Sequence, residues 1–362
     1  MFLIKKGKFM EHILIVDDNI TNLKLAEQVL RPSYKVTLLT SAIQTMKFLM
    51  RNTPDLILLD IKMPGMNGFE TLSTIKSIPR LSKIPVIFLT ALNDQKNEIK
   101  CLKLGAVDFI AKPFVPELML SRIKLHLELS SYRKNLEGLV NEKTQTIENL
   151  QDTMVIGLAE LVECRDGETG GHIKRTAKYL EILVKSMEEQ RLYSDILTSD
   201  YVHNMIRSAP LHDIGKIGIS DNVLLKQGSF DEAEREYMQQ HTILGGRALQ
   251  KVINSTDGES FLYVAKDMAL CHHEKWDGTG YPYGLYKEQI PLCARIMAIA
   301  DVYDALTSKR PYKKPFTHEK AVQIILEGKG TQFDPDIVDI FKTIAYKFDK
   351  ISKIYNTDLE ES

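Results

Sequence analysis

The amino-acid sequence predicts a multidomain protein, in which a doubly wound α/β domain and an all-α domain are joined by one long helix. Three observations predict this organisation. Five short apolar runs alternate with helix-length segments before residue 116, and strand-like alternation fades beyond residue 155. Between them, about forty residues contain no proline and almost no glycine. A chain of 362 residues is long enough for two or three domains with separate cores.

The composition is that of a globular protein. Hydrophobic residues make up 44% of the chain and charged residues 26%, and no apolar run approaches the roughly 20 residues that cross a bilayer. Lys and Arg number 47 against 48 Asp and Glu, so the net charge is −1, which argues against a generally basic nucleic-acid binder. No helix-turn-helix candidate follows the α/β domain, so direct DNA binding is not expected.

The cysteines and the first residues bear on location. Four scattered cysteines form no C-x-x-C pair and favour reduced thiols in a cytoplasm: Cys101, Cys164, Cys271 and Cys293. Residues 1–10 have two short apolar patches split by lysines and no small-residue cleavage site, so we expect a loose leader and not a signal peptide.

The first domain is expected to begin at residue 11. Short apolar runs, each followed by a helix-length segment or a loop, predict strands at residues 13–16, 35–40, 55–59, 85–90 and 108–111. Short apolar strands separated by amphipathic helices are typical of a parallel sheet that is covered on both faces. Chemistry in such sheets gathers at the carboxyl ends of the strands.

Three carboxylates follow two of these strands. Asp17 and Asp18 end the first strand and Asp60 ends the third. Without a counterion they would repel one another, so a bound cation is expected, and Mg²⁺ suits an oxygen-rich, partly hydrated site. Asp60 can accept a phosphoryl group, while Lys112 can neutralise its oxygens and the Thr90 hydroxyl can bond one of them.

The same positions carry a family pattern. It consists of VDDN at 16–19, LLDIKMPGMNGFE at 58–70, FLTA at 88–91 and DFIAKPF at 108–114. Residues 11–128 thereby resemble the receiver domain of two-component response regulators. The resemblance implies a flavodoxin-like sheet of order 2-1-3-4-5 and phosphorylation of Asp60 by a cognate histidine kinase. It also implies a switch formed by Thr90 and Phe109.

A long helix is predicted over residues 116–156, overlapping the last helix of the α/β domain. Its apolar positions recur with 3,4 spacing at Leu125, Leu129, Tyr132, Leu136 and Leu139, and resume at Ile147, Leu150 and Met154. The interval at Lys143 interrupts the heptad as a four-residue stutter would. The stripe fits either a homodimeric coiled coil or packing of the helix on its own domain.

The second domain is expected over residues 150–350, followed by a tail at 351–362. Helical spacing predicts helices at about 172–189, 199–209, 231–251, 260–273, 293–306, 317–328 and 335–347. Five of the nine histidines stand in distinctive settings in this half: E-T-G-G-H ending at His172, H-D-I-G-K from His212 to Lys216, His241, and the pair His272–His273. We interpret the other four as structural: His12, His126, His203 and His318.

Imidazoles mixed with carboxylates indicate a site for divalent metals such as Fe, Mn or Zn. The adjacent His212 and Asp213 can supply a bridging carboxylate between two ions. Two ions about 3.5–4 Å apart can bind a phosphodiester and lower the pKa of a bridging water. This chemistry hydrolyses phosphodiesters without a protein nucleophile.

A second family pattern covers residues 150–350. It consists of ETGGHIKR at 168–175, LHDIGKIG at 211–218, CHHEKWDGTGYPYGL at 271–285, QIPLCARIMAIADVYDALTSKRPYK at 289–313 and GTQFDP at 330–335. These residues resemble an HD-GYP domain, a branch of the HD metal-dependent phosphohydrolases. The resemblance implies hydrolysis of cyclic di-GMP to pGpG and often to GMP.

The resemblance also implies roles for single residues. The metal ligands, for two or three ions with Fe or Mn expected, would be Glu168, His172, His212, Asp213, His241, His272, His273 and Asp301. Asp213 and Lys216 would act in catalysis, with Lys216 on the phosphate or in proton transfer, and Arg310 and Lys313 would contact the nucleotide. Arg175 fits either a nucleotide contact or a surface salt bridge.

Some alternatives remain open in the sequence. The loop with the GYP triplet, Gly280, Tyr281 and Pro282, fits a lid over the ligand, a surface for a protein partner, or an ordinary connection. The leading function is a phosphorylation-regulated phosphodiesterase. A catalytically silent cyclic di-GMP sensor and a phosphohydrolase for another cyclic dinucleotide are the other two hypotheses.

Overall fold

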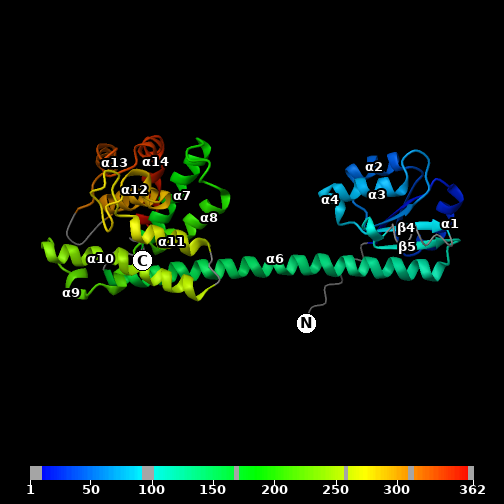
Figure 1. Ribbon diagram of the computed structural model, residues 1–362, viewed down its shortest axis with the longest axis horizontal. Helices are drawn as coiled ribbons and strands as arrows, with labels where there is room; N and C mark the ends of the chain where they lie inside the picture. Colours follow the sequence, from blue (N-terminus) through cyan, green and yellow to red (C-terminus); the bar gives the residue numbers. More distant parts are fainter. Residues whose placement is uncertain (1–9, 92–101, 167–170, 257–259, 309–313, 358–362) are drawn as a thin grey trace. The chain divides into compact units, whose positions relative to one another are not determined.

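The computed structural model describes residues 10–91, 102–166, 171–256, 260–308 and 314–357 (Figure 1). The chain divides into a first unit, residues 1–145, and a second unit, residues 146–362. Each unit has its own hydrophobic core. None of the described helices is both long enough and apolar enough to span a membrane.

The first unit is built on a five-stranded parallel sheet. Its strands are β1 (His12–Val16), β2 (Lys35–Leu39), β3 (Leu56–Asp60), β4 (Val86–Ala91) and β5 (Asp108–Lys112). They lie in the order β2-β1-β3-β4-β5, which confirms the predicted doubly wound fold. Val16 on β1 pairs with Leu39 on β2 and with Leu59 on β3, so these strands end level with one another.

Helices cover both faces of this sheet. They are α1 (Ile20–Leu30), α2 (Ala42–Arg51), α3 (Gly68–Ser77), the short α4 (Pro79–Ser82) and the first turns of α6 (Pro116–Asp166). Because side chains alternate along a strand, Ile13 and Ile15 pack in one core with α1 and α6, while Leu14 and Val16 pack in the other with α2 and α3. Both faces are therefore apolar.

Helix α6 is a single continuous helix from Pro116 to Asp166, so the predicted end at residue 156 is wrong (Figure 1). Ala159 and Val162 are buried, and this tertiary packing stabilises turns that the spacing of apolar residues does not reveal. The apolar stripe of the helix is exposed, with Leu129 53%, Leu136 62% and Leu150 54% accessible. Leu129 and Leu136, which belong to the first unit, are therefore not packed into its core.

In its described part, the second unit is built from helices joined by loops. Its elements are α7 (His172–Glu189), α8 (Ser199–Ser208), η1 (Ala209–Leu211), η2 (Ile214–Gly218), α9 (Asp221–Leu224), α10 (Glu232–Ser255), α11 (Ser260–Cys271), η3 (Lys287–Gln289), α12 (Leu292–Thr307), α13 (His318–Glu327) and α14 (Pro335–Thr357). All seven predicted helices are present. Helix α14 extends to Thr357, into the predicted tail, because Phe348 and Ile351 are buried.

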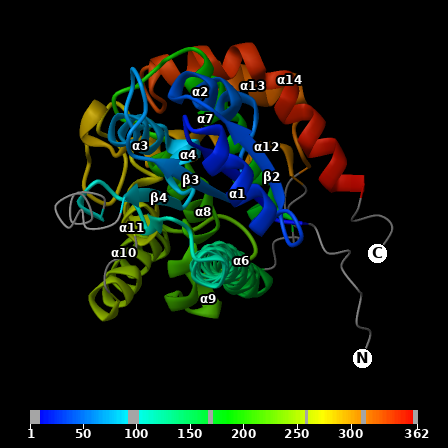
Figure 2. The same ribbon diagram turned by 90° about the vertical axis from the view of Figure 1, so that its right-hand side faces the viewer.

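Helix α12 lies at the centre of this unit. It carries buried apolar residues on all its sides, among them Ile296, Met297 and Ile299, as expected of a helix without a solvent face. It contacts α7, α11, α13 and α14, and α12, α13 and α14 lie together in both views (Figures 1 and 2). The polar residues that α12 carries are consequently held inside a packed core.

Candidate functional site

An acidic pocket lies at the carboxyl ends of β1 and β3. Asp17, Asp18 and Asp60 place one carboxylate oxygen each within 4.8 Å of one another. Lys112 Nζ donates to Asp17 Oδ2 at 2.6 Å and to Asp60 Oδ1 at 2.7 Å. Thr90 lines the same cavity of about 230 Å³. The pocket thus brings together the five residues that the sequence placed at the strand ends.

Of the two predicted switch residues, Thr90 and Phe109, only Thr90 lines the pocket. Thr90 is buried in the pocket, whereas Phe109 is absent from its lining and packs half-buried against the α2–α3 core. Burial raises the pKa of the Asp60 carboxyl, and the Lys112 ammonium partly offsets this effect. The pocket has room for a cation beside Asp60, which is the oxygen-rich setting that Mg²⁺ prefers.

The second candidate site is assembled by a close backbone approach. A Cβ added at Gly215 would lie 1.9 Å from the carbonyl oxygen of His241 and 2.4 Å from Gly245 N. Only glycine therefore lets η2 pack directly on α10. This contact brings Asp213, at the start of η2, beside His241 on α10.

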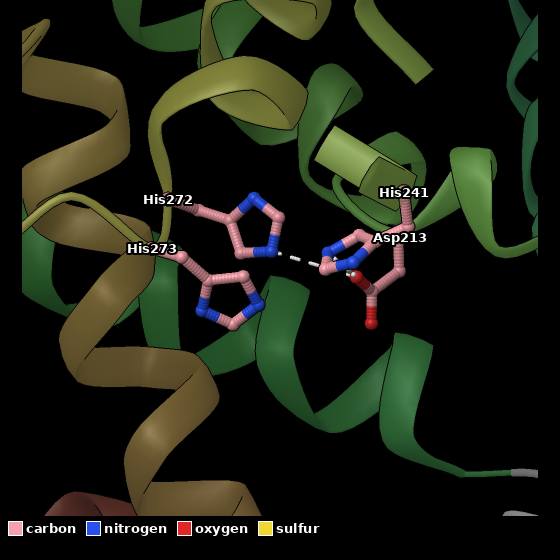
Figure 3. A group of neighbouring side chains, drawn as sticks. All are labelled: Asp213, His241, His272 and His273. Carbon is pink, nitrogen blue, oxygen red and sulfur yellow. Dashed lines mark ion pairs between the residues drawn. The ribbon is translucent and has the colours of Figure 1, made fainter. Parts of the chain in front are cut away.

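The predicted metal ligands form two neighbouring groups. One contains Asp213, His241, His272 and His273 (Figure 3), and the other contains His172, His212 and Asp301. Within each group, one ligand atom from every residue lies within 4.8 Å of the others. The two groups draw on α7, η1–η2, α10, the end of α11 and α12, so they exist only in the folded unit.

Asp213 lies between the two groups. Its Oδ1 is 3.3 Å from His241 Nε2 and 3.4 Å from His272 Nε2. Its Oδ2 is 3.6 Å from His212 Nε2, in the other group. One carboxylate thus faces both groups with different oxygens, the arrangement expected of a bridging ligand.

The histidine side chains are oriented for coordination. Nδ1 of His212 donates to Ala209 O at 2.8 Å, Nδ1 of His241 to Met238 O at 2.8 Å, and Nδ1 of His272 to Met268 O at 3.0 Å. A carbonyl only accepts, so each Nδ1 carries the proton and each Nε2 keeps its lone pair. Among the described residues, Asp213 Oδ1, His241 Nε2 and His272 Nε2 are buried without a hydrogen-bond partner. A divalent cation fits this convergence of acceptors.

The protonation states also suit metal binding. Burial lowers the pKa of His212 to about 4, and burial together with His272 and His241 lowers that of His273 well below its ordinary value. Burial alone would raise the pKa of the Asp213 carboxyl, but Lys216 and the surrounding histidines hold it well below its usual range. At neutral pH His212 and His273 are therefore neutral and Asp213 is anionic.

Lys216 lies at the edge of this centre and is held by the end of α6. Its Nζ donates to Asp213 Oδ2 at 2.9 Å and to Asp166 Oδ2 at 2.6 Å. Arg165, next to Asp166, donates to the carbonyls of Ile217 and Ile219, each at 2.7 Å. Neither α6 residue was predicted from the sequence, because the predicted helix ended ten positions before Asp166.

Arg175 and Asp304 form a buried pair beside His172. Arg175 Nε donates to Asp304 Oδ1 at 2.7 Å, and His172 Nδ1 donates to Asp304 Oδ2 at 2.9 Å. Neither the nucleotide contact nor the surface salt bridge expected for Arg175 is correct, because its side chain is only 2% accessible and faces Asp304. A signal for Asp304 was present, since it lies three residues after Asp301 on a helix whose buried residues are mostly apolar.

The GYP loop folds back onto the histidine pair. Tyr281 N donates to His273 O at 3.3 Å, and the two rings lie 4.9 Å apart. The buried Glu274 carboxylate accepts from the backbone amides of Tyr283 and Leu285. Gly280 leaves no space for a side chain, because a Cβ would lie 2.3 Å from Lys275 N. Tyr281 thus forms a wall of the site, whereas Tyr283 is exposed.

The remaining predicted residues are accounted for as follows. Glu168, Arg310 and Lys313 lie outside the described residues. Of the histidines interpreted as structural, His203 is exposed, and the other three bond ordinary partners: His12 with Thr37, His126 with Asp108, and His318 with Tyr303.

Comparisons with known proteins match both units. The response regulator receiver domain family matches residues 13–124, and the HD domain family matches residues 172–337. The chain is 42% identical to the "Probable cyclic di-GMP phosphodiesterase" of Vibrio cholerae, over 91% of this chain and 76% of that protein. It is 33% identical to the "Cyclic di-GMP phosphodiesterase response regulator RpfG" of Xanthomonas campestris, over 91% of this chain and 86% of that protein.

A further relative differs in its named substrate. The "3'3'-cGAMP-specific phosphodiesterase 2" of Vibrio cholerae is 39% identical to this chain, over 59% of this chain and 38% of that protein. HD-domain phosphodiesterases are metal-dependent, and the two groups around Asp213 are candidate clusters for such metals.

Proposed function

Because the chain belongs to the response regulators that join a receiver domain to an HD domain, we propose that it is a phosphorylation-regulated phosphodiesterase for cyclic di-GMP. The observation that carries the proposal is the position of the Asp213 carboxylate, which faces a histidine group with each oxygen. Hydrolysis converts a 3'–5' phosphodiester bond and one water into a phosphomonoester and a free hydroxyl, giving pGpG and then GMP.

The proposed metal ligands are Glu168, His172, His212, Asp213, His241, His272, His273 and Asp301. We propose Fe or Mn as the metal, since mixed imidazole and carboxylate ligands suit these ions, and Glu168 makes a third ion compatible with the set. Adjacent divalent ions, when bound, lower the pKa of a bridging water and neutralise phosphoryl oxygens. Asp213 then orients both sites through its two oxygens.

Lys216 is proposed to act on the phosphate. Its ammonium group is 2.9 Å from Asp213 and is held by Asp166, so its charge stays at the edge of the metal groups. From there it can neutralise a phosphoryl oxygen or give a proton to the leaving ribose oxygen, which becomes the free hydroxyl. Arg310 and Lys313 are proposed as nucleotide contacts, since the guanidinium fork suits both a guanine edge and a phosphate.

The receiver is proposed to control this activity. Its phosphodonor is a histidine kinase, Asp60 is the phosphoryl acceptor, and Asp17, Asp18 and Asp60 hold Mg²⁺. The pairing of Lys112 with Asp60 at 2.7 Å supports this assignment, because a lysine there can neutralise the added phosphoryl oxygens. Thr90 and Phe109 are proposed as the switch.

Further parts of the proposal concern partners and location. The exposed stripe of α6 supports a homodimeric coiled coil, and the exposed Tyr283 of the GYP loop supports contact with a protein partner. Free Cys164, Cys271 and Cys293 fit a reducing compartment such as the cytoplasm.

The test is a turnover assay on metal-loaded protein with cyclic di-GMP, coupled to elemental analysis. Production of pGpG or GMP is expected, with loss of bound metal and of turnover in His212→Ala. His203→Ala is the matched control, because His203 is an exposed histidine of the same unit. Retained hydrolysis in His212→Ala would overturn the site, and tight nucleotide binding without turnover under Fe or Mn would identify a silent sensor.

A second candidate substrate is 3'3'-cGAMP. The relative named for this substrate supports it, because its 39% identity extends over 59% of this chain. The same assay with both dinucleotides decides between them. A higher kcat/KM for cyclic di-GMP is expected, and the reverse order would assign the chain to the hybrid dinucleotide.

Phosphorylation is tested separately with a small-molecule phosphodonor. One phosphoryl group per chain is expected in the presence of Mg²⁺, and none in Asp60→Asn. Asp55→Asn is the matched control, since Asp55 lies immediately before the opposite end of the same strand. Equal labelling of both variants would place the phosphoryl group elsewhere.

A further inference from the structure

Asp304 is a buried carboxylate that the proposed reaction does not use. It lies on α12 and is only 1% accessible. Its Oδ2 accepts from His172 Nδ1 at 2.9 Å, from Arg175 Nη2 at 2.9 Å and from Ser308 Oγ at 3.1 Å, and its Oδ1 accepts from Arg175 Nε at 2.7 Å. A buried anion with this many donors is fixed in position.

The Nδ1–H group of His172 donates to a carboxylate, whereas those of three other candidate ligands donate to backbone carbonyls. His212, His241 and His272 each donate Nδ1–H to a neutral backbone carbonyl. His172 donates to a full negative charge. A carboxylate partner makes an imidazole a stronger donor to a metal than a carbonyl partner does.

The other nitrogen of His172 faces the second metal group. Its Nε2 lies 3.3 Å from His212 Nε2 and 3.8 Å from Asp301 Oδ1. Asp304 therefore contacts the side of the ring that points away from the group, and Arg175 balances the charge of Asp304 through two hydrogen bonds. The His172 ring therefore lies between the buried Arg175–Asp304 ion pair and the candidate metal position.

We infer that Asp304 is a positioning residue that tunes one of the two metal groups and not the other. This rests on the proposed metal role of His172. Asp304 holds His172 in the tautomer with the proton on Nδ1, and makes Nε2 of His172 a stronger metal ligand. The group of His172, His212 and Asp301 then depends on Asp304. The group of Asp213, His241, His272 and His273 is oriented through backbone carbonyls at His241 and His272, and does not depend on it.

Asp304→Asn tests this dependence. The amide keeps the shape of the carboxylate but replaces one acceptor by an N–H donor, which must face either Arg175 or His172. The measurements are Mn²⁺ stoichiometry after dialysis and Mn²⁺ titration calorimetry of the full chain. We expect one class of Mn²⁺ site to weaken by about 10- to 100-fold, as for other partners of ligating histidines, while the remaining Mn²⁺ affinity is unchanged.

Asp334→Asn is the matched control. Asp334 is equally buried and accepts from Arg295 Nη1 at 2.6 Å and from Tyr193, but it is not bonded to any of the candidate ligands that the structure describes. This variant should lower thermal stability and leave Mn²⁺ binding as in the wild type. If both variants lose only stability and titrate as wild type, Asp304 is a structural ion-pair residue and the inference is overturned.

The outcomes separate this inference from the proposed function. If wild-type protein binds neither Mn²⁺ nor Fe²⁺, the proposed function fails. If wild type binds, His212→Ala does not and Asp304→Asn titrates normally, only the inference fails. Should Asp304→Asn not fold by circular dichroism, Ser308→Ala removes one donor from the same oxygen. The same Mn²⁺ site should then weaken, and a wild-type titration would contradict the inference.

Discussion

Gly215 has only a hydrogen atom in place of a side chain, and this allows Asp213 to lie close to His241. Replacing this hydrogen by a methyl group in Gly215→Ala would push η2 away from the α10 backbone, because neither neighbouring backbone atom can yield. We expect a loss of about 1–3 kcal/mol in the free energy of unfolding, as for overpacked cores, together with weaker metal binding.

Gly218→Ala is the control for this variant. A Cβ there would lie 2.9 Å from Leu244 Cδ1, the far end of a flexible side chain that can rotate away. Denaturant titration and elemental analysis of both variants provide the comparison. Equal effects at the two positions would contradict the role of the close approach at Gly215.

The buried ring of His212 is expected to make the metal-free protein less stable at acidic pH. The pKa of His212 falls from 6.5 in the unfolded chain to about 4 in the folded one because the ring is buried. Between these values the unfolded chain binds the extra proton, so stability is present above pH 6.5 and is lost as the pH falls towards 4. Chelator-treated protein should therefore show a falling urea midpoint across this window.

His212→Asn should flatten that pH dependence, since it removes the titrating ring. His203→Asn should leave it unchanged, because His203 is exposed. A wild-type midpoint that is level from pH 7 to pH 4.5 would show that the buried histidines do not set the acid limit of the metal-free protein.

Among the elements, the last turn of α6 is joined to η2 by two adjacent side chains, Arg165 and Asp166. Arg165 donates to the carbonyls of Ile217 and Ile219 and pairs with Asp221 at 2.8 Å. We expect Arg165→Ala to free η2 and to lower turnover through Lys216, with kcat falling more than KM rises. The fold should persist, because Arg165 lies outside the apolar core.

The control joins the same helix to another element. Arg207 on α8 donates to Asp152 and Gln151 on α6, away from η2. Arg207→Ala should reduce thermal stability and leave kcat close to wild type. If Arg165→Ala retains the wild-type kcat, the end of α6 does not position Lys216.

The same elements show where sequence reasoning succeeds. Strands β1 to β5 follow from short apolar runs, which are local patterns, whereas their order was implied by the resemblance to receiver domains. The ends of α6 and α14 were predicted ten residues too early, because Ala159 and Ile351 are buried only through tertiary contacts. Arg175 was misassigned for the same reason, since its partner Asp304 lies 129 residues away.

At the scale of the whole molecule, the exposed stripe of α6 predicts self-association. Leu136→Lys places a charge in the stripe and should shift sedimentation of the full chain towards the monomer. Asn141→Lys adds the same charge at an exposed position outside the stripe, and should sediment as the wild type does. A wild-type chain that remains monomeric at high concentration would exclude the coiled coil.

The candidate site was predictable at this scale because its residues come as motifs. The set from His172 to Asp301 was identified from the motif pattern, although it spans 130 positions of the chain. Motifs do not reveal the side chains that position the site residues. Asp166 meets Lys216, and Asp304 meets His172, only when the chain folds.

Helix α6 has a lysine from a candidate site close to each end. Lys112 stands four positions before its first residue, and Lys216 is bonded to its last residue, Asp166. If binding at the receiver pocket is coupled through α6 to binding at the metal groups, the coupling free energy is the same in both directions, since coupling between two binding sites is reciprocal. If a phosphoryl analogue such as beryllofluoride tightens nucleotide binding by some factor, nucleotide must tighten beryllofluoride binding by the same factor. The receiver would then report the occupancy of the enzyme back to the kinase.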